Sequence, residues 1–196
     1  MKPHHLLACA VALGVSACAT PTYISPVEVT RFVGNAPAQL GTGTISLQAA
    51  QGIDDTPDLA AFRAALADEL ESLGYEVVLA NGAQTGAITL QQNVALPGDD
   101  RGPVSVGGGA SAGSYGSGVG LGIGIDLTPR EAERIETFLA LAIRANAGGP
   151  NLWEGRASMS VSANSTLADQ HEAAARLAAA LLTDFPGQSG ETIIVE

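Results

Sequence analysis

Two segments in the second half of the chain alternate apolar and polar residues, and this pattern limits what the chain can fold into. A repeat of two residues is the signature of a strand with one face buried. The short segment Asn146 to Pro150 between them favours a turn and therefore a β-hairpin. The apolar faces are Ile135, Leu139, Leu141 and Ile143 within 134–144, and Trp153, Gly155, Ala157, Met159 and Val161 within 152–161.

Further strands are expected earlier in the chain. Alternation predicts them at Val27–Phe32, Gly41–Gln48 and Ala87–Leu96, although Gln92 interrupts the apolar face of the last; Tyr75–Leu79 is a short run leading into the next strand. Between 119 and 127, aliphatic residues alternate almost entirely with glycine. Glycine weakens a strand, so this composition indicates either close packing against that face or low-complexity sequence.

Two segments carry the signals of helices. The first has Thr56 at the N-cap and Pro57 at the first helical position, and it ends at Gly74. Its apolar residues fall three and four apart: Leu59, Phe62, Leu66, Leu70 and Leu73. The second is predicted over Thr166–Phe185, where Thr166 and Asp169 resemble a capping box.

This order of elements predicts an α+β fold. We expect an antiparallel or mixed sheet of about five to six strands with two α-helices packed on one face. A single domain would cover 27–196, with a mobile Gly/Ser-rich loop at 97–118.

The N-terminus carries a targeting signal. Lys2 precedes an apolar run from Leu6 to Ala17, which is too short to span a membrane. The residues Val15-Ser16-Ala17-Cys18 look like the lipobox of a bacterial lipoprotein. We therefore expect 1–17 to be a signal peptide, cleavage between Ala17 and Cys18, and lipidation of Cys18 with acyl chains such as palmitate. An ordinary secretory signal cleaved near Ala17 is the alternative.

Stable anchoring requires two or more acyl chains, which mature lipoproteins of this type usually carry. Residues 18–26 would then be a lipidated tether. Ala19, rather than Asp, follows the cysteine and points to the outer membrane, with the domain on the periplasmic face.

The composition of the mature chain excludes several functions. Removal of the signal leaves eight Arg against twenty Asp and Glu, a formal net charge of −12. Nucleic acid and anionic lipid headgroups are therefore poor partners. Cys9 is lost with the signal and Cys18 is acylated, which excludes a disulfide, a cysteine-ligated metal site and a cysteine nucleophile.

The chain offers few candidates for catalysis or metal binding. His171 is the only histidine after the signal and is expected to be a solvated helix residue. Asp54-Asp55 and Asp99-Asp100 lack the spacing of a calcium loop and are expected to be solvated loop acids. We therefore predict no cofactor and no metal.

The Gly/Ser-rich segment contains no recognisable active-site motif. Ser114 and Ser117 are not part of a Gly-x-Ser-x-Gly elbow. Gly107-x-Gly109-x-x-Ala112 is a degenerate dinucleotide fingerprint, but no helix follows it to bind a phosphate. We therefore do not expect an enzyme.

Two aromatic residues, Trp153 and Tyr75, could form a sugar-binding surface. The alternation places Trp153 on the same face as Met159 and Val161, which favours a place in the core.

Several segments in order resemble a known family. They are the 62–75 helix closing on Glu71-Ser-Leu-Gly-Tyr75, the Ile88-Thr-Leu-Gln strand, the Gly-rich strand, Asn151-Leu-Trp-Glu-Gly-Arg-Ala157 and a final helix closing on Asp184-Phe-Pro-Gly187. Together with the lipobox, the chain resembles, over about 27–195, the bacterial lipoproteins grouped as domain of unknown function 4136. The resemblance implies an anchored periplasmic α/β domain and supplies no catalytic residues.

The function expected from the sequence is that of an outer-membrane-anchored periplasmic lipoprotein of unknown biochemical role. A non-enzymatic envelope or protein-interaction module is favoured, with the membrane and an envelope protein as partners. The alternative is a small-molecule binding domain that uses the glycine face of 118–126 or the space beneath the Gly/Ser loop.

Overall fold

The computed structural model describes residues 21–95, 104–113, 116–125, 132–146 and 149–196. Over the span predicted as one domain, 27–196, the chain divides into two compact units. One unit comprises Thr22–Ala95 and Glu133–Glu196, and the strands between 104 and 125 belong to the other. In the described part of the chain, no helix is both long and apolar enough to cross a membrane.

The larger unit is built on a seven-stranded mixed sheet in the order β3-β2-β4-β7-β8-β1-β9. β2 runs parallel to β3 and to β4, and the remaining pairs are antiparallel. The α+β fold is confirmed, with slightly more strands than predicted. The strands are β1 (Val27–Val33), β2 (Gly43–Ala49), β3 (Tyr75–Val78), β4 (Gln84–Ala95), β7 (Arg134–Arg144), β8 (Asn151–Ser162) and β9 (Thr192–Val195).

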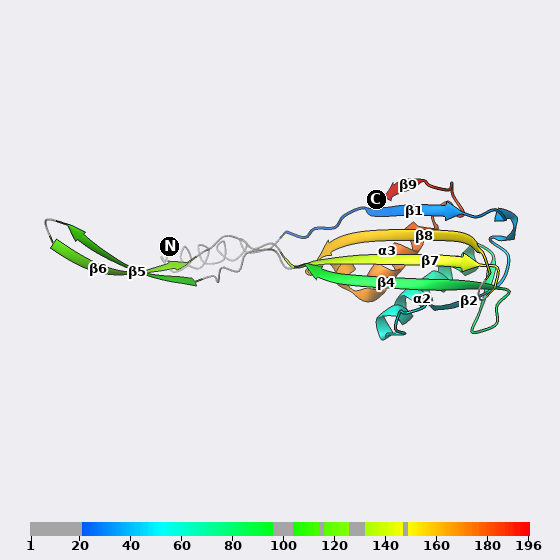
Figure 1. Cartoon of the computed structure of the whole chain (residues 1–196), viewed down its shortest axis with the longest axis horizontal. Coiled ribbons are helices and arrows are strands. Elements are labelled where there is room, and N and C mark those ends of the chain that lie inside the picture. Colours follow the sequence, from blue (N-terminus) through cyan, green and yellow to red (C-terminus); the bar gives the residue numbers. More distant parts are fainter. Residues whose placement is uncertain (1–20, 96–103, 114–115, 126–131, 147–148) are drawn as a thin grey trace, which may run out of the picture. The chain divides into compact units, whose positions relative to one another are not determined.

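Two α-helices cover one face of this sheet, and Figure 1 shows both on the same side of it. Helix α2 (Pro57–Ser72) begins as predicted, because the Thr56 hydroxyl accepts a hydrogen bond from the amide of Leu59 at 3.2 Å. Gly74 follows it with a φ of +102°, which glycine adopts without strain. A short 3-10 helix, η2 (Pro37–Gln39), precedes β2.

Helix α3 (Gln170–Leu182) is shorter than the predicted Thr166–Phe185. Residues Thr166–Ala168 form a separate 3-10 turn, η3, which Ser165 caps. Asp169 is extended and accepts hydrogen bonds from the amides of His171 and Glu172 at 2.9 and 3.3 Å. The predicted start at Thr166 is therefore wrong, because Asp169 acts as the N-cap rather than as the third helical residue.

The core lies between the helices and the sheet. Alternate residues of the central strands point toward the helices, and the alternation predicted for β7 and β8 is confirmed. The largest fully buried side chains there are Trp153, Arg31, Phe62, Ile45, Leu59, Leu66, Leu70, Ile88, Leu139, Leu141, Ile143 and Leu177.

The segment before β1 is part of the folded unit rather than a free tether. The amide of Ser25 donates to the carbonyl oxygen of Ser160 at 2.9 Å, and the amide of Ser162 donates to the carbonyl oxygen of Tyr23 at 2.8 Å. The guanidinium carbon of Arg134 lies 4.4 Å from the centre of the Tyr23 ring. The predicted tether 18–26 is thus shortened, because its last residues pair with β8.

The second unit contains a hairpin of β5 (Val104–Gly113) and β6 (Gly116–Ile125). The strands pair antiparallel from Val104 opposite Ile125 to Gly113 opposite Gly116. The predicted loop over 97–118 is therefore wrong for Val104–Gly113. Composition alone misled the prediction, because glycine weakens a strand but does not prevent one, and β5 pairs with β6 along its whole length.

Candidate functional site: the uncovered face of the sheet

The face of the sheet opposite the helices carries the candidate site. Strand register places Glu28 of β1, Ser158 of β8 and Phe138 of β7 side by side across it. In the next row, Ser160 of β8 pairs with Glu136 of β7. Phe138 is half-buried while Ser158, Glu28 and Glu136 are exposed. Small serines in the middle of larger side chains leave a hollow above the strands.

This hollow is a groove of about 450 Å³ between β1, β8 and β7. Its apolar surface comes from Phe138, Met159, Pro26 and Ile194, and its charged groups are Glu28 and Glu136. Among the described residues that line it there is no Lys, Arg or His. A smaller hollow of about 190 Å³ shares Glu28, Phe138 and Ser158 with the groove and is bounded by Arg156. We call the larger hollow the acidic groove.

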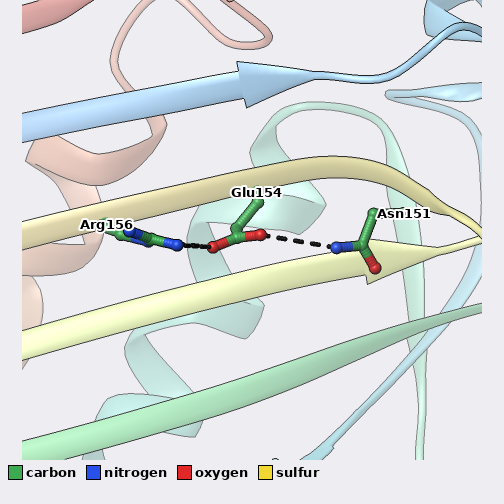
Figure 2. A network of polar contacts seen from close by, with 3 residues as sticks. All are labelled: Asn151, Glu154 and Arg156. Atoms are coloured by element: carbon green, nitrogen blue, oxygen red, sulfur yellow. Dashed lines mark hydrogen bonds and ion pairs between the residues drawn. The ribbon is translucent and has the colours of Figure 1, made fainter. Parts of the chain in front are cut away.

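A polar network borders the smaller hollow. Two guanidinium nitrogens of Arg156, Nη2 and Nε, donate to Oε1 of Glu154 at 2.6 and 2.9 Å, and the amide nitrogen of Asn151 lies 3.5 Å from Oε2 of Glu154 (Figure 2). Arg144 Nε donates to Oδ1 of Asn151 at 2.8 Å. The guanidinium carbon of Arg156 also lies 5.6 Å from the ring centre of Phe32. The smaller hollow, next to the acidic groove, is thus bounded by an arginine whose charge is already paired.

Two apolar side chains stand exposed at the β1–β9 side of this face. Phe32 is 42% exposed and Ile194 is 59% exposed. Ile194 pairs with Glu28 across the strands, so it lies beside the acidic groove. Ile194 thus adds exposed apolar surface to the acidic groove, whereas Phe32 is not among the residues that line it.

A second groove, of about 490 Å³, runs between α2 and β2 but is a weaker candidate. The charged residues that line it, Arg63 and Asp55, form an ion pair at 2.7 Å. Because these two charges pair with each other, the groove offers a ligand mainly apolar surface, from alanines and from Leu47, Val77, Val78 and Leu79.

The structure accounts for several residues considered from the sequence. His171 is exposed in the first turn of α3, as expected. Asp55 pairs with Arg63, and Asp54 is exposed. Within the described residues, no three His, Cys, Asp or Glu side chains gather as a metal site.

Other predicted sites cannot be compared with the structure. Ala17, Cys18, Asp99-Asp100 and Ser114 lie outside the described residues. Gly107, Gly109 and Ala112 lie in β5 and Ser117 in β6, whose backbone alone is described.

Both aromatic residues are part of the core, and the alternation had predicted this for Trp153. Trp153 is fully buried and Tyr75 is 4% exposed. Phe185 lies between them, with ring centres 5.1 Å from Trp153 and 6.4 Å from Tyr75. The indole nitrogen donates to the carbonyl oxygen of Pro186 at 2.9 Å. Burial raises the pKa of the Tyr75 hydroxyl, and a backbone hydrogen bond from Gly41 partly opposes this.

Arg31 is the charged residue buried on the helix-covered face, at 2% exposure. Its burial lowers the pKa of the guanidinium, while the charges of Asp184 and Glu191 raise it. Its Nε and Nη2 atoms have no hydrogen-bond partner among the described residues. Its aliphatic stem packs where Gly187 has no side chain, so Arg31 belongs to the core and not to the groove.

Sequence reasoning missed the acidic groove because the register between β1, β8 and β7 assembles it. One signal was present, however. Within 134–144, the polar positions include an aromatic residue, Phe138. An aromatic side chain on the polar face of a strand indicates a surface that contacts something other than water.

Comparisons with known proteins bear on the fold alone. The sequence matches no protein-family model and no curated protein. A PDZ domain protein from Parabacteroides distasonis ATCC 8503 is similar in structure, with a TM-score of 0.50 and 14% identity. The match covers 97% of this chain and 42% of that one, so this chain spans less than half its length. The PelC dodecamer from Paraburkholderia phytofirmans gives a TM-score of 0.44 and 12% identity, covering 83% and 99% of the two chains.

Proposed function

We propose that the chain is a lipoprotein of the outer membrane, facing the periplasm, that docks a protein partner on the uncovered face of its sheet. The lipobox at 15–18 and the resemblance to domain of unknown function 4136 support the location. The acidic groove is the single observation that carries the docking role.

The short spacer supports a position close to the membrane. If Cys18 is the lipidated N-terminus, only residues 18–21 separate it from Thr22, where the folded unit begins. Four extended residues span at most about 14 Å. The wall of the acidic groove includes Ser25 and Pro26, so the groove would lie near the membrane surface.

The chemistry of the groove selects a basic partner. A cation can interact with the face of Phe138 while the carboxylates of Glu28 or Glu136 accept its hydrogen bonds. The acidic chain as a whole also attracts a basic partner and repels an acidic one. The domain acts here by binding, without catalysis.

The spacing of the two carboxylates indicates an extended segment. Glu28 and Glu136 lie two strands and two residues apart, which places their Cα atoms about 12 Å from each other. In an extended peptide, residues four positions apart face the same side and lie about 13 Å apart. A segment with two basic residues at that spacing therefore matches the groove.

The proposal is tested with defined peptides and the unlipidated chain from Ala19. The peptide Arg-Ser-Ala-Ser-Arg should shift the NMR signals of Phe138 and Ser158, with an affinity that falls as salt rises. The acidic peptide Glu-Ser-Ala-Ser-Glu should have no effect. Glu28→Gln with Glu136→Gln should remove binding, and Asp68→Asn with Glu71→Gln, two exposed acids of α2, is the matched control.

Two results would count against this function. If the variant with Glu28→Gln and Glu136→Gln still binds the basic peptide, the acidic groove is not the binding site. A cationic small molecule that raises the melting temperature, where no basic peptide binds, would instead favour a small-molecule binding domain, since 450 Å³ is a usual size for such a site.

The anchor has a separate test in cells. Cys18→Ser should abolish labelling with radioactive palmitate and release the protein from the outer-membrane fraction. Unchanged fractionation of this variant would contradict the lipoprotein assignment.

A further inference from the structure

The β5–β6 hairpin has a feature that the docking role does not use. Its two strands, each of ten residues, pair along their whole length without a bulge. In the described part of the chain, no third strand joins this sheet. Both outer edges therefore present backbone N–H and C=O groups that no described strand pairs.

An isolated two-stranded hairpin is at best marginally stable in water. Stable sheets need a third strand or a packed layer. Natural proteins also protect free edges with charged residues, proline or bulges. The sequence from Gly102 to Ile125 contains no Asp, Glu, Lys, Arg or His, and its one proline, Pro103, precedes β5. The hairpin lacks the usual devices that keep an edge unpaired.

The distribution of charge indicates a second copy of the chain as the partner. The chain has a formal net charge of −11, so copies repel each other over most of their surface. The uncharged stretch from Gly102 to Ile125 is free of this repulsion. Identical edges also have matching length and register. Attachment to one membrane would further raise the local concentration of copies.

We propose that the β5–β6 hairpins of separate copies pair edge to edge and continue one sheet from copy to copy. This inference rests on the hairpin and is independent of the acidic groove. Because every hairpin has two edges, pairing does not end at a dimer, and assemblies of three or more copies are expected.

The test uses the full-length lipidated protein in detergent, with its mass measured by multi-angle light scattering. The wild type should give a mass of at least three copies. Ser105→Lys with Ser111→Lys and Ser117→Lys adds charge along both strands and should reduce the mass to that of one copy. The matched control Thr42→Lys with Gln51→Lys and Gln188→Lys adds the same charge at exposed positions and should keep the wild-type mass.

Crosslinking gives a second readout. A copy with Ala112→Cys should form a disulfide with a copy carrying Ser117→Cys in mixed samples, because these positions stand opposite each other when the register of the hairpin continues between copies. Gln51→Cys with Gln188→Cys should not. Replacement of Gly102–Ile125 by a short Gly-Ser linker should give a monomer whose circular dichroism retains the signal of the larger unit.

The proposal is overturned by a monomeric wild type at every concentration, or by a lysine variant that keeps the wild-type mass. A monomer whose hairpin resists protease only in lipid vesicles would also overturn it, because lipid rather than a second copy would then cover the edges.

Discussion

The two faces of the seven-stranded sheet are made by neighbouring residues of the same strands, yet they serve different ends. On β7, Leu139, Leu141 and Ile143 are completely buried under the helices, while Glu136 and Phe138 line the acidic groove on the other face. One face holds the fold together and the other remains available. Substitutions one position apart on the same strand should therefore affect either mainly stability or mainly binding.

The largest effect is expected from Leu139→Ala compared with Phe138→Ala. Leu139 has no exposed surface, so its truncation should lower the free energy of unfolding by about 2–5 kcal/mol. Phe138 is only half-buried, and its truncation should cost roughly 1 kcal/mol but remove binding of the basic peptide. Urea unfolding measures the stability of each variant, and a peptide titration measures its binding. Equal losses of stability would mean that the second face is also a packed core.

A methyl group added on each face gives the next comparison. Gly155 lies on the covered face, where a Cβ would overlap the ring of Trp153 and approach Leu181. Gly155→Ala should cost about 1–3 kcal/mol through overpacking. Ser158→Thr adds one methyl group on the open face and should change stability by less than about 0.5 kcal/mol. Thermal unfolding of both variants measures these effects. An unchanged melting temperature for Gly155→Ala would contradict the close packing around Gly155.

The covered face should also respond to alkaline pH through Tyr75. Burial raises the pKa of its hydroxyl in the folded state. The corresponding stability is complete below the unfolded pKa of about 10 and is lost as the pH rises through the folded value. Tyr75→Phe should therefore flatten the decline in the urea midpoint above pH 10. An unchanged decline would show that other groups cause it.

The smallest effect is expected at Arg156 on the open face. Arg156 and Glu154 form an ion pair at 2.6 Å, and the Arg156 side chain is 50% exposed. Such a pair contributes about 0.2–1 kcal/mol. Arg156→Gln should lower the urea midpoint only slightly and should not weaken binding of the basic peptide. A loss of several kcal/mol would show that this network is structural.

The two faces were not equally predictable from the sequence. The covered face follows from local alternation, which correctly placed Leu139, Trp153 and Ile88 in the core. Helix α2 could also be predicted, because Thr56, Pro57 and Gly74 are local signals of where a helix begins and ends. The acidic groove could not be predicted from the sequence, because Glu28 and Phe138 are brought together only by pairing between β1, β8 and β7.

The errors have the same origin. Strand β5 was taken for a loop because its hydrogen bonds come from β6, which the composition of Val104–Gly113 cannot reveal. The start of α3 was misplaced because Ser165 and Asp169 cap two successive helices, η3 and α3, which the sequence analysis took for one.

The proposed docking role depends most directly on the negative charge of the acidic groove, and reversing that charge tests it. Glu28→Lys with Glu136→Lys should abolish binding of Arg-Ser-Ala-Ser-Arg and create binding of Glu-Ser-Ala-Ser-Glu, with the urea midpoint unchanged, as followed by isothermal titration calorimetry. Wild-type affinity of the swapped protein for the basic peptide would contradict the account.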